Sequence, residues 1–267
     1  MPAQLRDQPR IVIAGLGLAT PLGMSAWQTF RALLAGRTIA DRAASLDEGV
    51  DLVDLVRTLG CIGSVQHTAI DPAVELLEHV ARQALEMAQI PALDVPCIAA
   101  ASKGAMGALT DAMHQAVVSE GRSNRVMLTP DAYLAVALGS HGYLAHHLCR
   151  RLHVRHIQNV VAACASGLTA VHAARCAMLN NPQLRTLLVV ACEASLLPMF
   201  IHGYRRLGVL PPLTQRGYRG RPLDRRRCGF MLAEQAAAVL LLRVDHSEPL
   251  PPDQIELLDT AIACEAY

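Results

Sequence analysis

Short apolar runs alternate along the chain with longer segments in which apolar residues recur every three or four positions. The short runs are bounded by polar residues or turn formers, a pattern that predicts strands. They lie at 10–14, 95–101, 157–163, 186–192, 237–244 and 255–264. The longer segments predict helices, which are expected at 25–34, 51–59, 72–88, 110–120, 130–138, 143–152 and 166–180.

Capping residues support several of these helix boundaries. Asp71 and Pro72 stand as N-cap and first helical residue of the clearest helix, whose charged positions all lie opposite its apolar face. Ser25 is placed to cap an earlier helix, and Gly36 follows that helix as a C-terminal stop. Residues 37–70 otherwise predict a loop region with one weak helix and a short strand near 61–66, and residues 121–124 predict a turn.

Cys164 falls at the elbow between a predicted strand, Ile157 to Ala163, and a predicted helix that runs from Ser166 to Asn180. At such an elbow, free backbone N–H groups and the positive end of the helix favour an anion. A thiol placed there tends to ionise more readily, and the thiolate is a nucleophile. The alternative is that Cys164 is a small packing residue, as most cysteines are.

The helix after Cys164 is apolar on nearly every side. From residue 165 to residue 179 its polar side chains are Ser166, Thr169, His172 and Arg175. A helix with this pattern is typically buried all round, so we expect cover on two opposite faces.

Composition narrows the class of protein. The chain has 267 residues, of which 52% are hydrophobic and only 3% aromatic, values that suit an α/β protein better than a β-sandwich. A net charge of +1 implies no general attraction to nucleic acid or membrane. The eight cysteines are scattered without a Cys-x-x-Cys pair, which suggests neither a zinc site nor a disulfide framework and favours a reducing cytoplasm.

The start of the chain carries two weak signals that we interpret structurally. Arg6 and Arg10 before an apolar run imitate a signal peptide, but Gly15, Gly17 and Pro21 interrupt that run. The same Gly-x-Gly after a strand imitates a dinucleotide-binding loop, but Pro21 disturbs the helix start that such a loop needs. A strand followed by a turn explains both features.

Two motifs resemble the β-ketoacyl synthases, condensing enzymes of the thiolase superfamily. Residues 163–168 read Ala-Cys-Ala-Ser-Gly-Leu, similar to the family's nucleophile elbow, and residues 221–230 read Arg-Pro-Leu-Asp-x-x-Arg-x-Gly-Phe, close to a second family motif. The resemblance implies an α/β fold: one α/β half of a thiolase-like αβαβα sandwich, with a mixed five-stranded sheet. It also implies that residues 1–267 form a single domain equivalent to the N-terminal half of the family.

The resemblance also implies roles for individual residues. Cys164 matches the nucleophile, or a remnant of one, and no cofactor or metal is expected. The family's catalytic histidines lie in the half that this sequence does not match, so independent condensation is not expected. Four residues fall on family motifs where structural roles are expected: Glu193, Asp224, Arg227 and Glu234. Lys103, in a Ser-Lys-Gly turn after a strand, suggests an anion site or a solvated loop charge.

Partners follow from the same resemblance. The uncovered helix face and the strand before Cys164 predict an interface with a full-length ketosynthase, formed by Ile157, Val160, Val161, Leu168 and Val171. Arg225 and Arg226 are candidates for docking an acyl carrier protein. The chain then resembles a chain-length factor, a catalytically deficient subunit that shapes the acyl pocket of an active partner. The alternative is a split or residual Cys-dependent 3-oxoacyl-[acyl carrier protein] synthase or acyltransferase.

Overall fold

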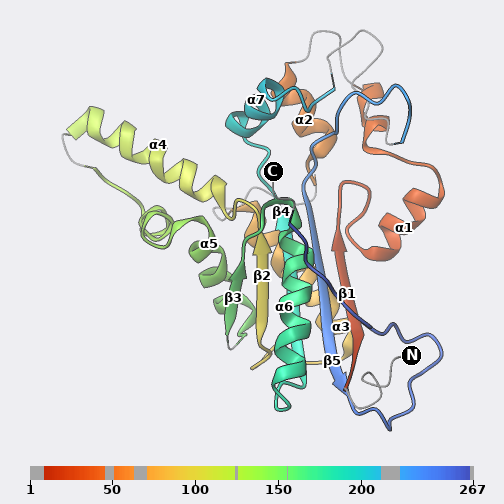
Figure 1. Cartoon of the computed structure of the whole chain (residues 1–267). Coiled ribbons are helices and arrows are strands. Elements are labelled where there is room, and N and C mark those ends of the chain that lie inside the picture. Colours follow the sequence, from red (N-terminus) through yellow and green to blue (C-terminus); the bar gives the residue numbers. More distant parts are fainter. Residues whose placement is uncertain are drawn as a thin grey trace.

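Five strands form one mixed sheet at the centre of the molecule (Figure 1). The computed structural model describes residues 9–45, 51–62, 71–123, 126–154, 156–211 and 223–264. The strand order across the sheet is β1 (Arg10–Ala19), β5 (Gln235–Val244), β4 (Thr186–Glu193), β2 (Cys97–Ala101) and β3 (Ile157–Val160). Neighbours on the β1 side run antiparallel, whereas β4, β2 and β3 run parallel. The mixed five-stranded sheet expected from the sequence is therefore confirmed.

The sheet is covered on both faces, and strand side chains alternate between the two cores. Helix α3 (Pro72–Ala88) packs on one face together with α5 (Pro130–Leu152), and α6 (Ser166–Asn180) packs on the other. On β2, Cys97 and Ala99 belong to the core under α3, and Ile98 and Ala100 to the core under α6. This period of two matches the pleat of a strand that is buried on both sides.

Helix α3 forms as its capping signal predicts. The Asp71 carboxylate accepts a hydrogen bond from the Ala73 backbone N–H at 2.8 Å, and Pro72 is the first helical residue. The second carboxylate oxygen of Asp71 accepts from the Ala108 N–H at 2.9 Å, which links this cap to the start of α4 (Met106–Ser123). The cap thus fixes two helices relative to each other.

The Gly-x-Gly near the start of the chain lies inside β1, because this strand continues to Ala19 and does not end at residue 14. A Cβ added to Gly15 would lie 1.9 Å from the carbonyl oxygen of Ala84, and one on Gly17 would lie 1.9 Å from that of Val80. Both oxygens belong to α3. The glycines therefore allow the helix backbone to approach the strand, and they form no dinucleotide loop.

Two further elements differ from the sequence expectation. Helix α4 begins at Met106 and continues through residue 123, so 121–123 are helical where a turn was predicted. The strand predicted at 255–264 is wrong: only Glu256 forms a bridge, with Val12. Beyond it the chain leaves the edge of β1 and crosses onto α6, where Thr260 hydrogen-bonds His172 at 2.8 Å. Cys61 and Ile62 form no strand, and the rest of the short strand proposed at 61–66 lies outside the described residues.

A smaller cluster sits beyond the carboxyl ends of the parallel strands, at the top of Figure 1. Helices α2 (Leu52–Gly60) and α7 (Pro198–Arg206) pack there around an apolar core of their own. At the β1 side, α1 (Ala26–Leu34), capped by Ser25, is followed by a 3-10 helix, η2 (Ile39–Ser45). Among the described helices, none is both long enough and apolar enough to cross a membrane.

Helix α5 contains the two helices that the sequence predicts at 130–138 and 143–152. Gly139 separates them with a left-handed φ of 66°, which kinks the helix. Helix α5 packs on α4 and also contacts β3, where the Asn159 side chain donates to the His141 carbonyl at 3.3 Å. As a result, α4 projects from the body as an arm on the β3 side of the sheet (Figure 1).

We predict that Gly17→Ala lowers the free energy of unfolding by about 1–3 kcal/mol, because the new methyl group must push α3 away from β1. Urea unfolding followed by circular dichroism measures the change. Gly203→Ala in α7 is the matched control: nothing lies within 4 Å of its added Cβ, so it should be neutral or stabilise by up to about 1 kcal/mol. Equal effects of the two substitutions would contradict the close approach.

Candidate functional site

Cys164 lies in a tight turn between β3 and α6, as the sequence predicts, but β3 ends at Val160 and does not continue to Ala163. Residues 163–165 form one turn of 3-10 helix, η3, and the Cys164 side chain is exposed. Ala163 takes a φ of 47°, a conformation that a residue with a side chain rarely adopts. Sharp strand-to-helix turns of this kind present a nucleophile at the end of a sheet.

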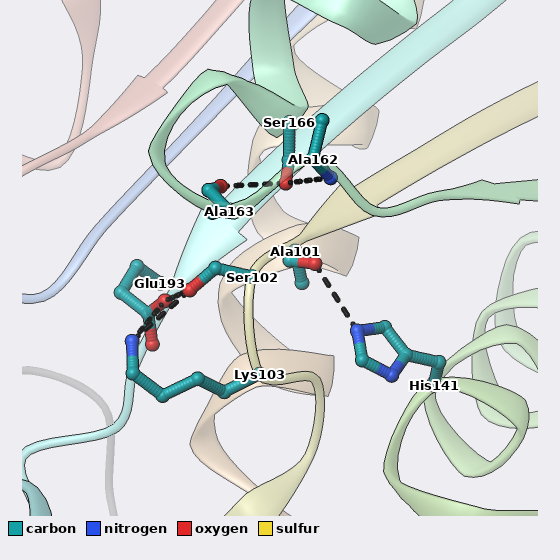
Figure 2. A network of polar contacts seen from close by, with 8 residues as sticks. All are labelled: Ala101, Ser102, Lys103, His141, Ala162, Ala163, Ser166 and Glu193. Carbon is teal, nitrogen blue, oxygen red and sulfur yellow. Dashed lines mark hydrogen bonds and ion pairs between the residues drawn. The ribbon is translucent and has the colours of Figure 1, made fainter. Parts of the chain in front are cut away.

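Ser166 holds the turn in place (Figure 2). Its buried hydroxyl accepts a hydrogen bond from the Ala162 N–H at 2.9 Å and donates one to the Ala163 carbonyl at 2.7 Å. The same residue begins α6, so the helix N-terminus is fixed beside the cysteine. Negative charge that develops near the sulfur therefore lies at the positive end of a 15-residue helix.

A pocket of about 660 Å³ lies beside Cys164. This volume is within the range of small-molecule sites, roughly 300–1,000 Å³. The pocket is lined by the turn and first residues of α6, by the carboxyl ends of β2 and β4, by the first half of β5, and by residues 230–233. Its described lining is mostly apolar and includes two charged residues, Lys103 and Glu193.

Lys103 and Glu193 form an ion pair in the pocket wall (Figure 2). Lys103 Nζ lies 2.7 Å from Glu193 Oε2 and 3.0 Å from Ser102 Oγ, and the Ser102 hydroxyl also donates to Glu193. The ammonium lies 5.3 Å from the ring centroid of Phe200 and 6.0 Å from that of Tyr204, distances suited to cation–π attraction. Lys103 therefore connects the turn after β2, the end of β4 and helix α7.

The environment of Glu193 changes its pKa in two opposing ways. Burial by itself raises the pKa of this carboxyl group, but hydrogen bonds from Lys103 and Ser102 favour the charged form. The net result is a pKa below the ordinary value of 4.5. Glu193 is thus a charged hydrogen-bond acceptor for two elements of the pocket wall.

The other residues expected to be structural lie outside this network. Glu234 is buried and accepts a hydrogen bond from the Ile62 N–H at 3.0 Å, which joins the end of α2 to the start of β5. Asp224 organises a tight turn: its carboxylate accepts from the Arg226 N–H at 2.7 Å, and its carbonyl accepts from the Arg227 N–H at 3.2 Å. Arg225, Arg226 and Arg227 are exposed on this turn, where Arg226 also lies near Asp224.

The five predicted interface residues gather around β3 and the start of α6. Ile157 and Val160 are half-buried on β3, which is the edge strand of the sheet. Val161 is 54% exposed and Leu168 is 80% exposed, whereas Val171 packs partly on the core under α6. The structure therefore places Ile157 and Val160 on the edge strand, whereas Leu168 and Val171 line the Cys164 pocket.

Helix α6 packs on the sheet with one face, and the second cover that the sequence calls for is only partly supplied by the described residues. Its buried residues repeat every four positions along one face, namely Ser166, Ala170, Ala174 and Met178. The opposite face is covered only in part, where Arg175 binds the Leu258 carbonyl at 2.7 Å and His172 binds Thr260. An apolar helix thus keeps a face available for a further layer.

Two features of the site were missed from the sequence. Tyr204 and Phe230, 5.8 Å apart in an edge-to-face contact, belong to the pocket wall. The arm of α4 and the first half of α5 carries exposed large apolar residues, namely Met113, Val117, Met127, Tyr133 and Val136. Weak amphipathicity in 106–123 was the available signal, since apolar residues there recur on both sides of the helix.

The described pocket lining contains no histidine. His141 instead lies on α5, where its Nε2 is 3.1 Å from the Ala101 carbonyl oxygen (Figure 2). Within the described ranges, no group of three His, Cys, Asp or Glu side chains is arranged to hold a metal ion.

A mixed sheet between helices, with a cysteine at a strand-to-helix elbow beside a pocket, agrees with the thiolase-like α/β fold expected from the sequence. Residues 8–247 match the family described as "Beta-ketoacyl synthase, N-terminal domain". The chain belongs to the β-ketoacyl synthase family. It is similar to a 3-oxoacyl-[acyl-carrier-protein] synthase 2 of Coxiella burnetii (strain RSA 493 / Nine Mile phase I), with 26% identity over 91% of this chain and 60% of the relative.

Solved structures share the fold. The chain is similar to the ketosynthase complex AntDE:AntF, a type II polyketide synthase acyl carrier protein with its ketosynthase bound to the hexaketide. The TM-score is 0.70 at 18% identity, over 90% of this chain and 59% of that one. It is also similar to the ishigamide ketosynthase/chain length factor, with a TM-score of 0.65 at 18% identity, over 88% and 59%. The chain therefore spans about 60% of the length of these relatives.

We predict that Glu193→Gln destabilises the protein at pH 7 and flattens the acid side of its stability profile. Because the folded-state pKa of Glu193 is depressed, its stabilisation is present above the ordinary pKa of 4.5 and is lost as pH falls through the lower folded value. Urea unfolding from pH 7 down to about pH 3 measures the difference between wild type and variant, which should shrink towards low pH. Glu248→Gln, at an exposed carboxylate, is the control. A difference that stays constant across the range would contradict the pKa shift.

Proposed function

We propose that the chain is a chain-length-factor-type subunit that pairs with a full-length ketosynthase in acyl-carrier-protein-dependent fatty acid or polyketide chain elongation. The observation that carries this proposal is the edge of the sheet at β3, next to which Val161 and Leu168 expose apolar side chains. Membership of the β-ketoacyl synthase family supports the reaction class. We place this role in the cytoplasm.

The β3 edge is suited to pairing with another chain. β3 bonds only to β2 among the described strands, so the backbone groups on its other side are available for a further strand. In the family, the strand before the cysteine pairs in this way across a dimer axis. The similarity to a ketosynthase/chain length factor supports such a pairing here.

The arm enlarges the surface that a partner would cover. It projects on the β3 side (Figure 1), and its exposed apolar side chains would lose contact with water in a complex. Burying apolar area stabilises an interface by roughly 25 cal/mol per Å² before the costs of association. An arm held by the partner would also fix α5, which contacts β3.

Arg225 and Arg226 are proposed to meet the acidic surface of the acyl carrier protein. Both are exposed on the turn organised by Asp224, which lies close to the pocket-lining residues 230–233 in the chain. A similar solved structure contains an acyl carrier protein in complex with its ketosynthase, which supports a carrier as the second partner.

We predict that Leu168→Asp, alone or with Val161→Asp, weakens association with a co-expressed full-length ketosynthase at least tenfold. An unpaired carboxylate buried at an apolar contact costs more than the ~1.4 kcal/mol that corresponds to a factor of ten. Affinity purification followed by native mass spectrometry measures the complex. Leu93→Asp is the matched control, because Leu93 is 68% exposed but precedes β2 at the opposite end of the sheet. Equal complex yields from all the variants would contradict the proposed interface.

A second candidate function is acyl loading on Cys164. The observation that favours it is the exposed Cys164 side chain at the 660 Å³ pocket. The sulfur would attack the carbonyl carbon of an acyl thioester and form a new thioester. The bond from that carbon to the donor sulfur would break, and the donor would leave as a thiol with the proton of Cys164.

We predict that incubation with an acyl-N-acetylcysteamine thioester adds one acyl mass to the chain and that Cys164→Ala abolishes the addition. Intact mass spectrometry followed by peptide mapping locates the group. Cys228→Ala, at another exposed cysteine, should load like wild type. Acylation that persists in Cys164→Ala, or that is absent in wild type, would refute this second function.

A further inference from the structure

Lys103 is the single lysine in the 267-residue sequence, and its ammonium lies in the wall of the Cys164 pocket. Its nearest polar neighbours, Ser102 Oγ and Glu193 Oε2, belong to lining residues, as does the ring of Tyr204. The Lys103 side chain is only 18% exposed. The pocket therefore contains a fixed, largely desolvated cation that the elbow chemistry does not explain.

The ammonium keeps one donor for a ligand. A lysine ammonium has three N–H groups, and two are directed to Ser102 at 3.0 Å and Glu193 at 2.7 Å. Within the described part of the chain, no third oxygen or nitrogen acceptor lies within hydrogen-bond distance of this nitrogen. In the unliganded pocket, water can satisfy the third N–H.

A bound acyl chain changes the hydrogen bonding of the third N–H group of Lys103. A plain alkyl chain would displace the water and leave a buried N–H without an acceptor, a loss that costs free energy. An acyl group with a keto or hydroxyl oxygen beside the ammonium would replace the water as hydrogen-bond acceptor. Sites built to bond a ligand oxygen discriminate strongly against analogues that lack it.

The charges of Lys103 and Glu193 decide which kind of ligand oxygen can bind to the ammonium. Glu193 already neutralises Lys103, and its pKa is low enough to keep it ionised near neutral pH. A ligand carboxylate would meet Glu193 as well as Lys103, and the like charges would repel. A neutral carbonyl or hydroxyl oxygen meets no such repulsion.

We infer that Lys103 is a specificity-determining residue, which selects acyl groups that carry a keto or hydroxyl oxygen along the chain over saturated acyl groups of the same length. This inference rests on the second candidate function above, acyl loading of Cys164, since it requires that the pocket holds an acyl chain. It adds the chemical class of that chain and the residue that recognises it.

The test compares the loading rates of Cys164 with three N-acetylcysteamine thioesters of equal length: octanoyl, 3-oxooctanoyl and 5-oxooctanoyl. Intact mass spectrometry of the full chain gives the rates, and the ratio of oxo to octanoyl loading is compared between wild type and Lys103→Met. This substitution keeps an unbranched side chain that is one atom shorter, and it removes the N–H groups. Comparing ratios between proteins cancels the intrinsic reactivity of each thioester.

We expect the ratio for at least one oxo thioester to fall fivefold or more in Lys103→Met. Arg31→Met on α1, outside the pocket, should retain the wild-type ratio. Ratios within twofold of wild type for both oxo thioesters would overturn the inference. So would a complete lack of Cys164 loading, whereas the proposed pairing with a ketosynthase is scored separately by co-purification and would stand.

Chemical modification gives a second measurement if Lys103→Met does not fold. Reductive methylation with formaldehyde and a borohydride can act on Lys103 and the N-terminal amine, because the chain has no other lysine. Dimethyl-lysine keeps its charge but only one N–H, enough for Glu193 and none for a ligand. Protein shown by peptide mapping to be dimethylated at Lys103 should lose the oxo preference, and an unchanged preference would overturn the inference.

Discussion

The burial of β2 and β4 from both faces is the constraint on which the rest of the structure depends. Each strand contributes alternate side chains to the core under α3 and to the core under α6, so both helices are fixed to the same sheet. The carboxyl ends of the parallel strands then lie together at one end of the sheet, where open α/β sheets commonly place their ligand sites. The cysteine elbow, the ion pair of Lys103 and Glu193 and the pocket all lie at this end.

Strand register explains how the charged pair forms. Ala101 on β2 pairs with Cys192 on β4, so Ser102, which follows β2, lies beside Glu193, the last residue of β4. Lys103 comes one residue later and turns back to the carboxylate. A shift of two residues between these strands would separate the pair while preserving which face each side chain occupies. The contact between Lys103 and Glu193 in the pocket wall therefore depends on the register between β2 and β4.

Local patterns predicted the parts of the site that depend on local sequence. The strand, turn and helix around Cys164 follow from β-branched residues, a short polar break and a run of helix formers. The pocket partners Lys103 and Glu193 lie 90 positions apart, so their contact depends on strand register that no local pattern specifies. Gly15 and Gly17 resembled part of a loop because the helix backbone for which they leave room lies about 65 residues further along the chain. The kink at Gly139 was anticipated as a gap between helices, but the direction of the arm was not.

The short length of β3 affects how readily another chain can add to the sheet. A bare sheet edge is a template for indiscriminate strand addition, and therefore for aggregation. This one is only four residues long, and its two central residues, Gln158 and Asn159, expose polar side chains. Such an edge offers few backbone bonds to a random strand. A stable complex at this edge would also have to bury the exposed apolar side chains next to it, Val161 and Leu168.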